Sequence, residues 1–125
     1  MTAPAGEPPL VLASASPRRL DLLRQIGIVP HQTDPAEVDE RPRPRELPLA
    51  LVRRLAEAKA QAVAARHPEA TVLAADTVVA CGRRVLPKAE DAATARRCLE
   101  LLSGRRHNVL TGVALCAPGW SRLKV

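Results

Sequence analysis

The chain has 125 residues, of which 46% are hydrophobic, so its length and apolar content fit one globular domain with a buried core. Phe and Tyr are absent and Trp120 is the one aromatic residue, which argues against a nucleic-acid-binding sheet that stacks bases on aromatic side chains. The net charge of +6 indicates a polyanionic partner. Charge alone does not separate a nucleotide from a nucleic acid, or either from a merely soluble basic surface.

The cysteines and the hydropathy pattern bear on the compartment. Cys81, Cys98 and Cys116 are widely spaced and contain no CxxC pair, which favours reduced thiols over a metal clip or a disulfide framework. No apolar run is long enough for a membrane span, and the amino terminus lacks a basic start followed by a hydrophobic stretch. We therefore expect a cytoplasmic protein with no membrane partner.

The chain is predicted to begin with a tail, a strand and a helix. Residues 1–9 are rich in Pro, Gly and Ala and are expected to form a flexible tail. A buried strand over Leu10–Ser14 then leads into a helix from Pro17 to about Ile26. Ser16 stands where an N-cap belongs, the proline takes the first helical position, and Gly27 is a C-terminal signal.

The first turn of this helix carries two cations, Arg18 and Arg19. The helix dipole disfavours positive charge there unless an anion lies opposite it. The hydroxyls of Ser14 and Ser16, free backbone amides and two guanidiniums together predict a phosphate site. For Arg19 the alternative is a side chain whose stem lies on the core, but its place beside the serines favours anion binding.

An acidic loop punctuated by prolines follows a predicted short strand over residues 28–33. The prolines exclude regular structure in this loop. Asp34 and Glu37 are interpreted as solvated charges. Asp39 and Glu40 are candidates for holding a divalent cation, which prefers hard oxygen ligands, and solvated charge is the alternative for them as well.

A long helix is predicted over Leu47–Arg66, and it carries a lysine on its apolar stripe. Lys59 lies seven residues after Val52 and four residues from both Leu55 and Val63. A buried ammonium without a partner is costly, so Lys59 needs an anion. The sequence leaves open whether this anion is a structural carboxylate or a bound phosphate.

The uninterrupted apolar run over Thr71–Val79 predicts a central strand that is buried on both faces. Asp76 interrupts this run with a charge, and a buried carboxylate needs a cation, a metal or a cleft. Ligands bind at the carboxyl ends of strands in open α/β sheets. Asp76 is therefore the candidate general base or metal ligand, and Thr77 is expected to offer a hydroxyl to the same cleft.

The remaining segments are predicted to complete the domain. A short strand over residues 85–86 precedes Lys88, a helix spans residues 91–102, and an alternating strand runs over residues 107–115. His107 stands beside two arginines at a turn, where a lone histidine is more often structural than catalytic, so it is not a candidate.

These segments together resemble the Maf family of nucleoside triphosphate pyrophosphatases, in an order and spacing that match from about residue 10 to residue 115. The matching blocks are LASASPRR at 12–19, VDE at 38–40, LAEAKA at 55–60, AADTVV at 74–79, VL at 85–86 with Lys88, LSG at 102–104 with HNV at 107–109, and TGV at 111–113. Each block alone would be a weak signal. Their combination is specific.

The resemblance implies an α/β fold related to the inosine triphosphate pyrophosphatases, with a mixed twisted sheet flanked by helices and a cleft between two lobes. It implies hydrolysis of a nucleoside triphosphate to the monophosphate and pyrophosphate with Mg²⁺ or Mn²⁺. Asp76 would be the proton acceptor, and Asp76 and Glu40 would support the metal. The residues implied to bind the substrate are Ser14, Arg18, Arg19, Lys59, Thr77 and Lys88.

The family resemblance also bears on the choice of nucleotide. The pair Asp76-Thr77, together with Arg18, resembles the branch that acts on dTTP and UTP. The branch that acts on 7-methyl-GTP usually carries Gln after the aspartate. Family members are often dimers, so a homodimer is possible, and no nucleic-acid partner is expected.

Two departures from the family pattern stand out. Most relatives have Lys-Pro where this chain has Pro87-Lys88-Ala89, so the loop that carries Lys88 is expected to be shifted. Relatives also extend well beyond this length, so residues 10–117 are expected to form the first part of the family fold, with an incomplete second lobe, and residues 118–125 an atypical tail. The alternative function is a truncated, catalytically impaired nucleotide-binding remnant.

Overall fold

The computed structural model describes residues 8–86, 92–103 and 106–125. Their elements, in chain order, are β1 (Leu10–Leu12), α1 (Pro17–Gln25), β2 (Gln32–Thr33), α2 (Pro48–Arg66), β3 (Thr71–Cys81), β4 (Arg84–Val85), α3 (Ala92–Leu102), β5 (Asn108–Ala117) and β6 (Trp120–Lys124). The expected tail over residues 1–9 lies almost wholly outside the described part, and so do Lys88 and Asp91, the first residue of the predicted third helix. The predicted elements otherwise appear in the expected order, with shifted ends.

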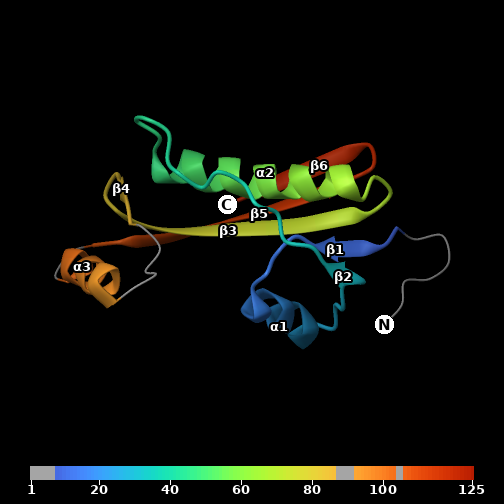
Figure 1. The fold of residues 1–125 in the computed structure, drawn as a ribbon, viewed down its shortest axis with the longest axis horizontal. Coiled ribbons are helices and arrows are strands. Elements are labelled where there is room, and N and C mark those ends of the chain that lie inside the picture. The colour runs from blue at the N-terminus through green and yellow to red at the C-terminus, as the bar shows by residue number, and fades with distance from the viewer. Residues whose placement is uncertain (1–7, 87–91, 104–105) are drawn as a thin grey trace.

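One mixed sheet forms the centre of the fold, with its strands in the order β2-β1-β3-β5-β6 and with β4 paired to β3. Strand β1 runs parallel to both β2 and β3, whereas β5 is antiparallel to β3 and to β6. Figure 1 shows α2 on one side of this sheet and α1 and α3 on the other. The predicted α/β class, a mixed sheet flanked by helices, is confirmed.

The core lies between α2 and the sheet because both elements present apolar side chains there. In β3 alternate residues are buried and those between them are half-buried or exposed. The prediction of a strand buried on both faces was wrong: successive side chains point to opposite faces, and only one face is buried. The buried members of this set are Val72, Ala74, Asp76, Val78 and Ala80. Helix α2 contributes Leu51, Val52, Leu55, Ala56, Ala60 and Val63 to the core. Asp76 is thus the one charged residue in the buried row of β3.

Gly112 of β5 allows α2 to lie close to the sheet. It pairs with Asp76 of β3 and faces the helix. A Cβ atom at this position would lie 2.9 Å from the carbonyl oxygen of Val52 and 3.3 Å from the Cβ of Ala56. Only glycine fits this approach without a shift of the helix. The glycine therefore sets the distance between α2 and the strand that carries Asp76.

The segment over residues 118–125, expected to be an atypical tail, contains a strand of the sheet. A turn that contains Gly119, at a φ of 85°, reverses the chain after β5. Strand β6 then pairs antiparallel with β5, from Ala117 opposite Trp120 to Val113 opposite Lys124. Glycine adopts this left-handed conformation at little cost, so the reversal is tight and the segment continues the sheet.

The described helices and the three cysteines can be set beside the expectations from the sequence. None of the described helices is long and apolar enough to cross a membrane. Cys81, Cys98 and Cys116 all lie in the described part, and the structure forms no disulfide among them.

Candidate functional site

Asp76 lies at the centre of the site, on the face of β3 that packs against α2. The Asp76 side chain is 5% exposed because the strand alternation points it toward the helix. A buried carboxylate requires a cation or hydrogen-bond donors, since desolvation of an unpaired charge is costly. Helix α2 supplies that cation.

Lys59 of α2 joins two carboxylates. Its Nζ donates to Oδ1 of Asp76 at 2.5 Å and to Oε1 of Glu40 at 2.9 Å, and the lysine side chain is only 12% exposed. Burial alone would lower the pKa of Lys59, but its hydrogen bonds to Asp76 and Glu40, together with their charges, raise the pKa above the usual value. The partners of this lysine, which the sequence left open, are carboxylates.

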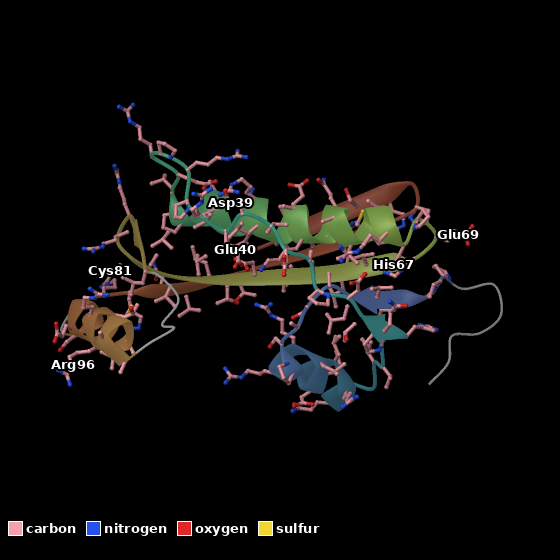
Figure 2. All side chains as sticks on the ribbon, in the orientation of Figure 1. Asp39, Glu40, His67, Glu69, Cys81 and Arg96 are labelled. Carbon is pink, nitrogen blue, oxygen red and sulfur yellow. The ribbon has the colours of Figure 1, made fainter. Side chains whose placement is uncertain are left out.

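The loop that carries Glu40 lies along α2, and in Figure 2 Asp39 and Glu40 are both labelled beside that helix. Asp39 turns away from the lysine and forms a bidentate pair with the exposed Arg41, at 2.9 Å for both bonds. The Arg41 guanidinium and backbone N–H hold the pKa of Asp39 well below its usual range. Of the two acidic residues proposed for a cation, only Glu40 therefore faces the site.

The turn between β1 and α1 forms the second part of the site. Ser14 is 7% exposed, and its Oγ accepts a hydrogen bond from the Ser16 backbone N–H at 3.0 Å. Ser16 is the N-cap of α1, and its Oγ accepts from the Arg19 N–H at 3.4 Å. A hydroxyl that accepts one hydrogen bond still has its own hydrogen to donate. The predicted cap and helix start are present.

Arg19 and Thr77 meet on the other face of β3. The Arg19 guanidinium donates to Thr77 Oγ1 at 3.4 Å, and Thr77 Oγ1 lies 3.1 Å from Thr111 Oγ1 of β5. Thr77 was expected to share the cleft with Asp76, but adjacent residues of a strand point to opposite faces of the sheet. Thr77 is therefore exposed on the α1 side, and it does not line the cavity but contacts Arg19, which does.

A cavity of about 520 Å³ lies between these two parts. Its lining comes from the β1–α1 turn, the loop after β2, and α2: Ala13, Ser14, Ala15, Ser16, Arg19, Pro35, Ala36, Glu37, Val38, Glu40 and Lys59. The serines and one arginine line one wall, and Glu40 and Lys59 line another. Asp76 is not among the lining residues and is joined to the cavity wall by its hydrogen bond to Lys59. Arg18 is exposed and does not line the cavity, and Lys88 lies outside the described part.

The carboxylates of Glu40 and Asp76 are the residues that could hold a divalent cation. They share the Lys59 ammonium, so their oxygens lie close together around one position. Mg²⁺ is commonly bound by one or two carboxylates together with substrate phosphates, so this donor set fits such an ion. Within the described ranges no group of three or more His, Cys, Asp or Glu residues is placed to hold a metal alone.

Two ion-pair clusters around the site were not anticipated from the sequence. Asp34, interpreted as a solvated charge, instead binds Arg66 at 3.0 Å and His67 at 2.7 Å. Its hydrogen bonds to His67 and Arg66 lower the pKa of Asp34. That interpretation was wrong because the carboxyl end of α2 returns to the loop after β2. The second cluster joins Arg54 and Glu46.

Known proteins resemble this chain over most of its length. The sequence model of the Maf family, described as Maf-like protein, matches residues 9–124. A dTTP/UTP pyrophosphatase of Paramagnetospirillum magneticum is 75% identical over 109 residues, which cover 87% of this chain and 57% of that protein. A dTTP/UTP pyrophosphatase of Rhodospirillum rubrum is 66% identical, covering 88% of this chain and 52% of that protein. The chain thus spans about half the length of the curated relatives it matches.

A solved structure shows the same fold at low sequence identity. The nucleoside-triphosphatase / dITP/XTP pyrophosphatase of Mycobacterium abscessus superposes with a TM-score of 0.56 and 21% identity, covering 92% of this chain and 69% of that one. The expected similarity to a nucleoside triphosphate pyrophosphatase fold is therefore confirmed.

Proposed function

Because the chain belongs to the family of Maf-like proteins, we propose that it hydrolyses nucleoside triphosphates to the monophosphate and pyrophosphate, with dTTP and UTP as preferred substrates. The observation that carries this proposal is the cavity that joins an anion-binding helix start to a buried lysine–carboxylate cluster. The first part suits the triphosphate, and the second suits the activation of water. The two relatives named dTTP/UTP pyrophosphatases support the choice of nucleotides.

The phosphates are bound by the β1–α1 turn. The hydroxyls of Ser14 and Ser16 and the guanidinium of Arg19 line one wall of the cavity, next to backbone N–H groups of the α1 start. A helix start of this kind favours anions through its unpaired N–H groups and its dipole. Arg18, exposed in the same turn, would also bind the triphosphate.

The reaction is an attack by water on the α-phosphorus. The new bond forms between the water oxygen and that phosphorus, the bond to the bridging oxygen breaks, and pyrophosphate leaves with the electron pair. Asp76 accepts the water proton, because its carboxylate has lone pairs beyond the one that Lys59 occupies. Lys59 neutralises charge that develops on the phosphoryl oxygens.

A divalent cation fits beside these residues. Glu40 and Asp76 would hold it, and when bound it would neutralise phosphate charge and help to orient the substrate. Lys59 offsets one of the two carboxylate charges, which leaves a net negative charge that suits a cation. The lysine also holds the two carboxylates close together.

The test is pyrophosphate release from dTTP, UTP and 7-methyl-GTP with Mg²⁺ or Mn²⁺, for the wild type and for Asp76→Asn. We expect turnover of dTTP and UTP to exceed that of 7-methyl-GTP. Asp76→Asn should lower turnover by about 10³-fold, the scale of a lost general base, with little change in dTTP affinity. The matched control is Asp21→Asn on the exposed surface of α1, which should leave turnover unchanged.

Two outcomes would contradict the proposal. If the wild-type chain binds dTTP but releases no pyrophosphate, it is a nucleotide-binding protein and not an enzyme. If Asp76→Asn retains wild-type turnover, another group accepts the proton.

A further inference from the structure

Arg54 of α2 fastens the loop that carries Glu40. Its Nε and Nη2 donate to the two carboxylate oxygens of Glu46, at 2.7 and 2.8 Å, and Nη2 also donates to the backbone carbonyl of Arg41 at 3.0 Å. This pair is shielded from solvent, with the Arg54 side chain 21% exposed and the Glu46 side chain 9% exposed. A bidentate guanidinium–carboxylate pair has a fixed geometry, so it holds the loop in one place.

The loop itself is shaped around the same carboxylate. Oε1 of Glu46 accepts the Arg43 N–H at 3.0 Å, and the Glu46 N–H donates to the Arg43 carbonyl at 3.0 Å. Arg45 between them has a φ of 62°, a conformation that most residues avoid and that surrounding contacts must maintain. The Arg54 hydrogen bonds lower the pKa of Glu46 to about 2, so the carboxylate is charged at neutral pH.

We infer that Arg54 is a positioning residue, which holds the 41–46 loop against α2 and thereby fixes Glu40 at the Lys59 ammonium. The inference rests on the proposed function, because it assigns Arg54 to the geometry of that site. Arg41, whose carbonyl Arg54 binds, directly follows Glu40 in the chain. Lys59 follows Arg54 by five residues on the same helix, about 7.5 Å along its axis. Helix α2 therefore positions both residues of the Glu40–Lys59 contact: it carries Lys59, and it holds the loop of Glu40 through Arg54.

We call the Arg54–Glu46 ion pair the brace. The variants that test it must remove this pair without leaving a buried charge unpaired. Arg54→Met alone would leave the Glu46 carboxylate buried and unpaired, which is strongly destabilising. The double variant Arg54→Met/Glu46→Met removes both charges and keeps apolar volume at the two sites. Arg54→Lys keeps the charge but loses the bidentate geometry, so it should show an intermediate effect. Arg53→Met, an exposed neighbour on the same helix, is the matched control.

Amide hydrogen exchange tests whether the Arg54–Glu46 pair holds the loop in place, and this measurement does not depend on activity. We expect the amides of the 39–46 segment to exchange about tenfold faster in the double variant, while the amides of β3 and β5 keep their wild-type rates. Arg53→Met should leave all of these rates unchanged. Unchanged exchange in the 39–46 segment of a folded double variant would overturn the inference.

A double-mutant cycle with Glu40→Gln then tests whether Arg54 acts through Glu40. The double variant should lower kcat/KM for dTTP about tenfold when Glu40 is present, and less than about twofold in the Glu40→Gln background. Effects that multiply in the combined variant would overturn the inference, because a merely structural role predicts independence.

The experiments distinguish a failure of the proposed function from a failure of the positioning role of Arg54. If the wild type releases no pyrophosphate from any triphosphate, the proposed function fails. The same cycle is then read on the dTTP dissociation constant, and together with the exchange rates it still decides whether Arg54 positions Glu40.

Discussion

The two faces of β3 carry the two parts of the site, and they differ in how charge is balanced. On the α2 face, Lys59 lies between Asp76 and Glu40, and the cluster is mostly buried. On the α1 face, Arg19 has a hydroxyl of Thr77 beside it at 3.4 Å and lines the open cavity. Helix α2 buries seven side chains, whereas α1 buries none. One face is closed and holds one ammonium between two carboxylates, and the other is open and cationic.

This difference suits the two faces to different tasks in the proposed function: binding of phosphate on the α1 face and activation of water on the α2 face. An exposed guanidinium at a helix start is available to an incoming phosphate, because neutral hydroxyls do not compete with an anion. A buried lysine between two carboxylates is already paired inside the protein, and it holds the positions of both. In the proposed function, the α1 face would bind phosphate and the α2 face would hold the groups that activate water.

The largest expected effect tests the closed face. Lys59→Met leaves Asp76 buried without its cation, so the free energy of unfolding should fall by about 3 kcal/mol. Urea unfolding followed by circular dichroism measures this change. The control Lys59→Met/Asp76→Asn removes both charges and should recover most of the loss. A single variant as stable as the wild type would mean that the ion pair does not hold the closed face together.

Neighbouring residues of β5 give a matched pair of substitutions on the two faces. Gly112→Ala places a Cβ 2.9 Å from the Val52 carbonyl oxygen, so we expect a loss of about 2 kcal/mol in unfolding free energy. Thr111→Val, on the open face, should change stability by less than about 0.5 kcal/mol. Thermal unfolding of the two variants measures the contrast. Equal losses would show that the two faces are equally packed.

A substitution in α1 tests the open face. Arg19→Gln should weaken dTTP binding about tenfold, through loss of one charged contact to phosphate, while the unfolding free energy stays close to that of the wild type. Titration calorimetry measures the affinity. Arg24→Gln, in the last turn of the same helix, is the control and should leave affinity unchanged. A stability loss without an affinity loss would make Arg19 a structural residue.

The smallest effect is a pH dependence from the brace beside the closed face. The pKa of Glu46 is lowered from 4.5 to about 2 in the folded chain, so this carboxyl binds its proton more weakly when folded. Its stabilisation is present above about pH 4.5 and is lost as the pH falls toward 2. Urea unfolding at pH 5 and pH 3 should show a larger acid loss for the wild type than for Glu46→Gln. Equal losses would contradict the role of this pair.

Local signals in the sequence predicted the elements and most of the site. Ser16 followed by Pro17 marked the start of α1, the apolar run marked β3, and the charge at Asp76 marked the centre of the site. These predictions depend on neighbouring residues only. The sequence also showed that Lys59 needs an anion, because the helical period placed it on an apolar stripe.

What the sequence did not reveal depends on contacts between distant segments. The brace joins Arg54 to Glu46 and to a loop carbonyl, and no periodicity marks such a pair. Asp34 meets Arg66 across 32 positions of the chain, so it could not be told from a solvated charge. Gly112 did leave a signal, since glycine inside a strand often marks a close backbone approach.

Strand β3 keeps the two chemistries apart by register alone. It pairs with β1 on one side and forms nine successive residue pairs with β5 on the other, from Val72 to Ala80. A slip of one residue would turn the acid toward α1 and the hydroxyl toward α2, and every neighbour would change sides with them. Substitutions along β3 alter the site piece by piece. A single inserted or deleted residue between Val72 and Asp76 would exchange its two halves at once.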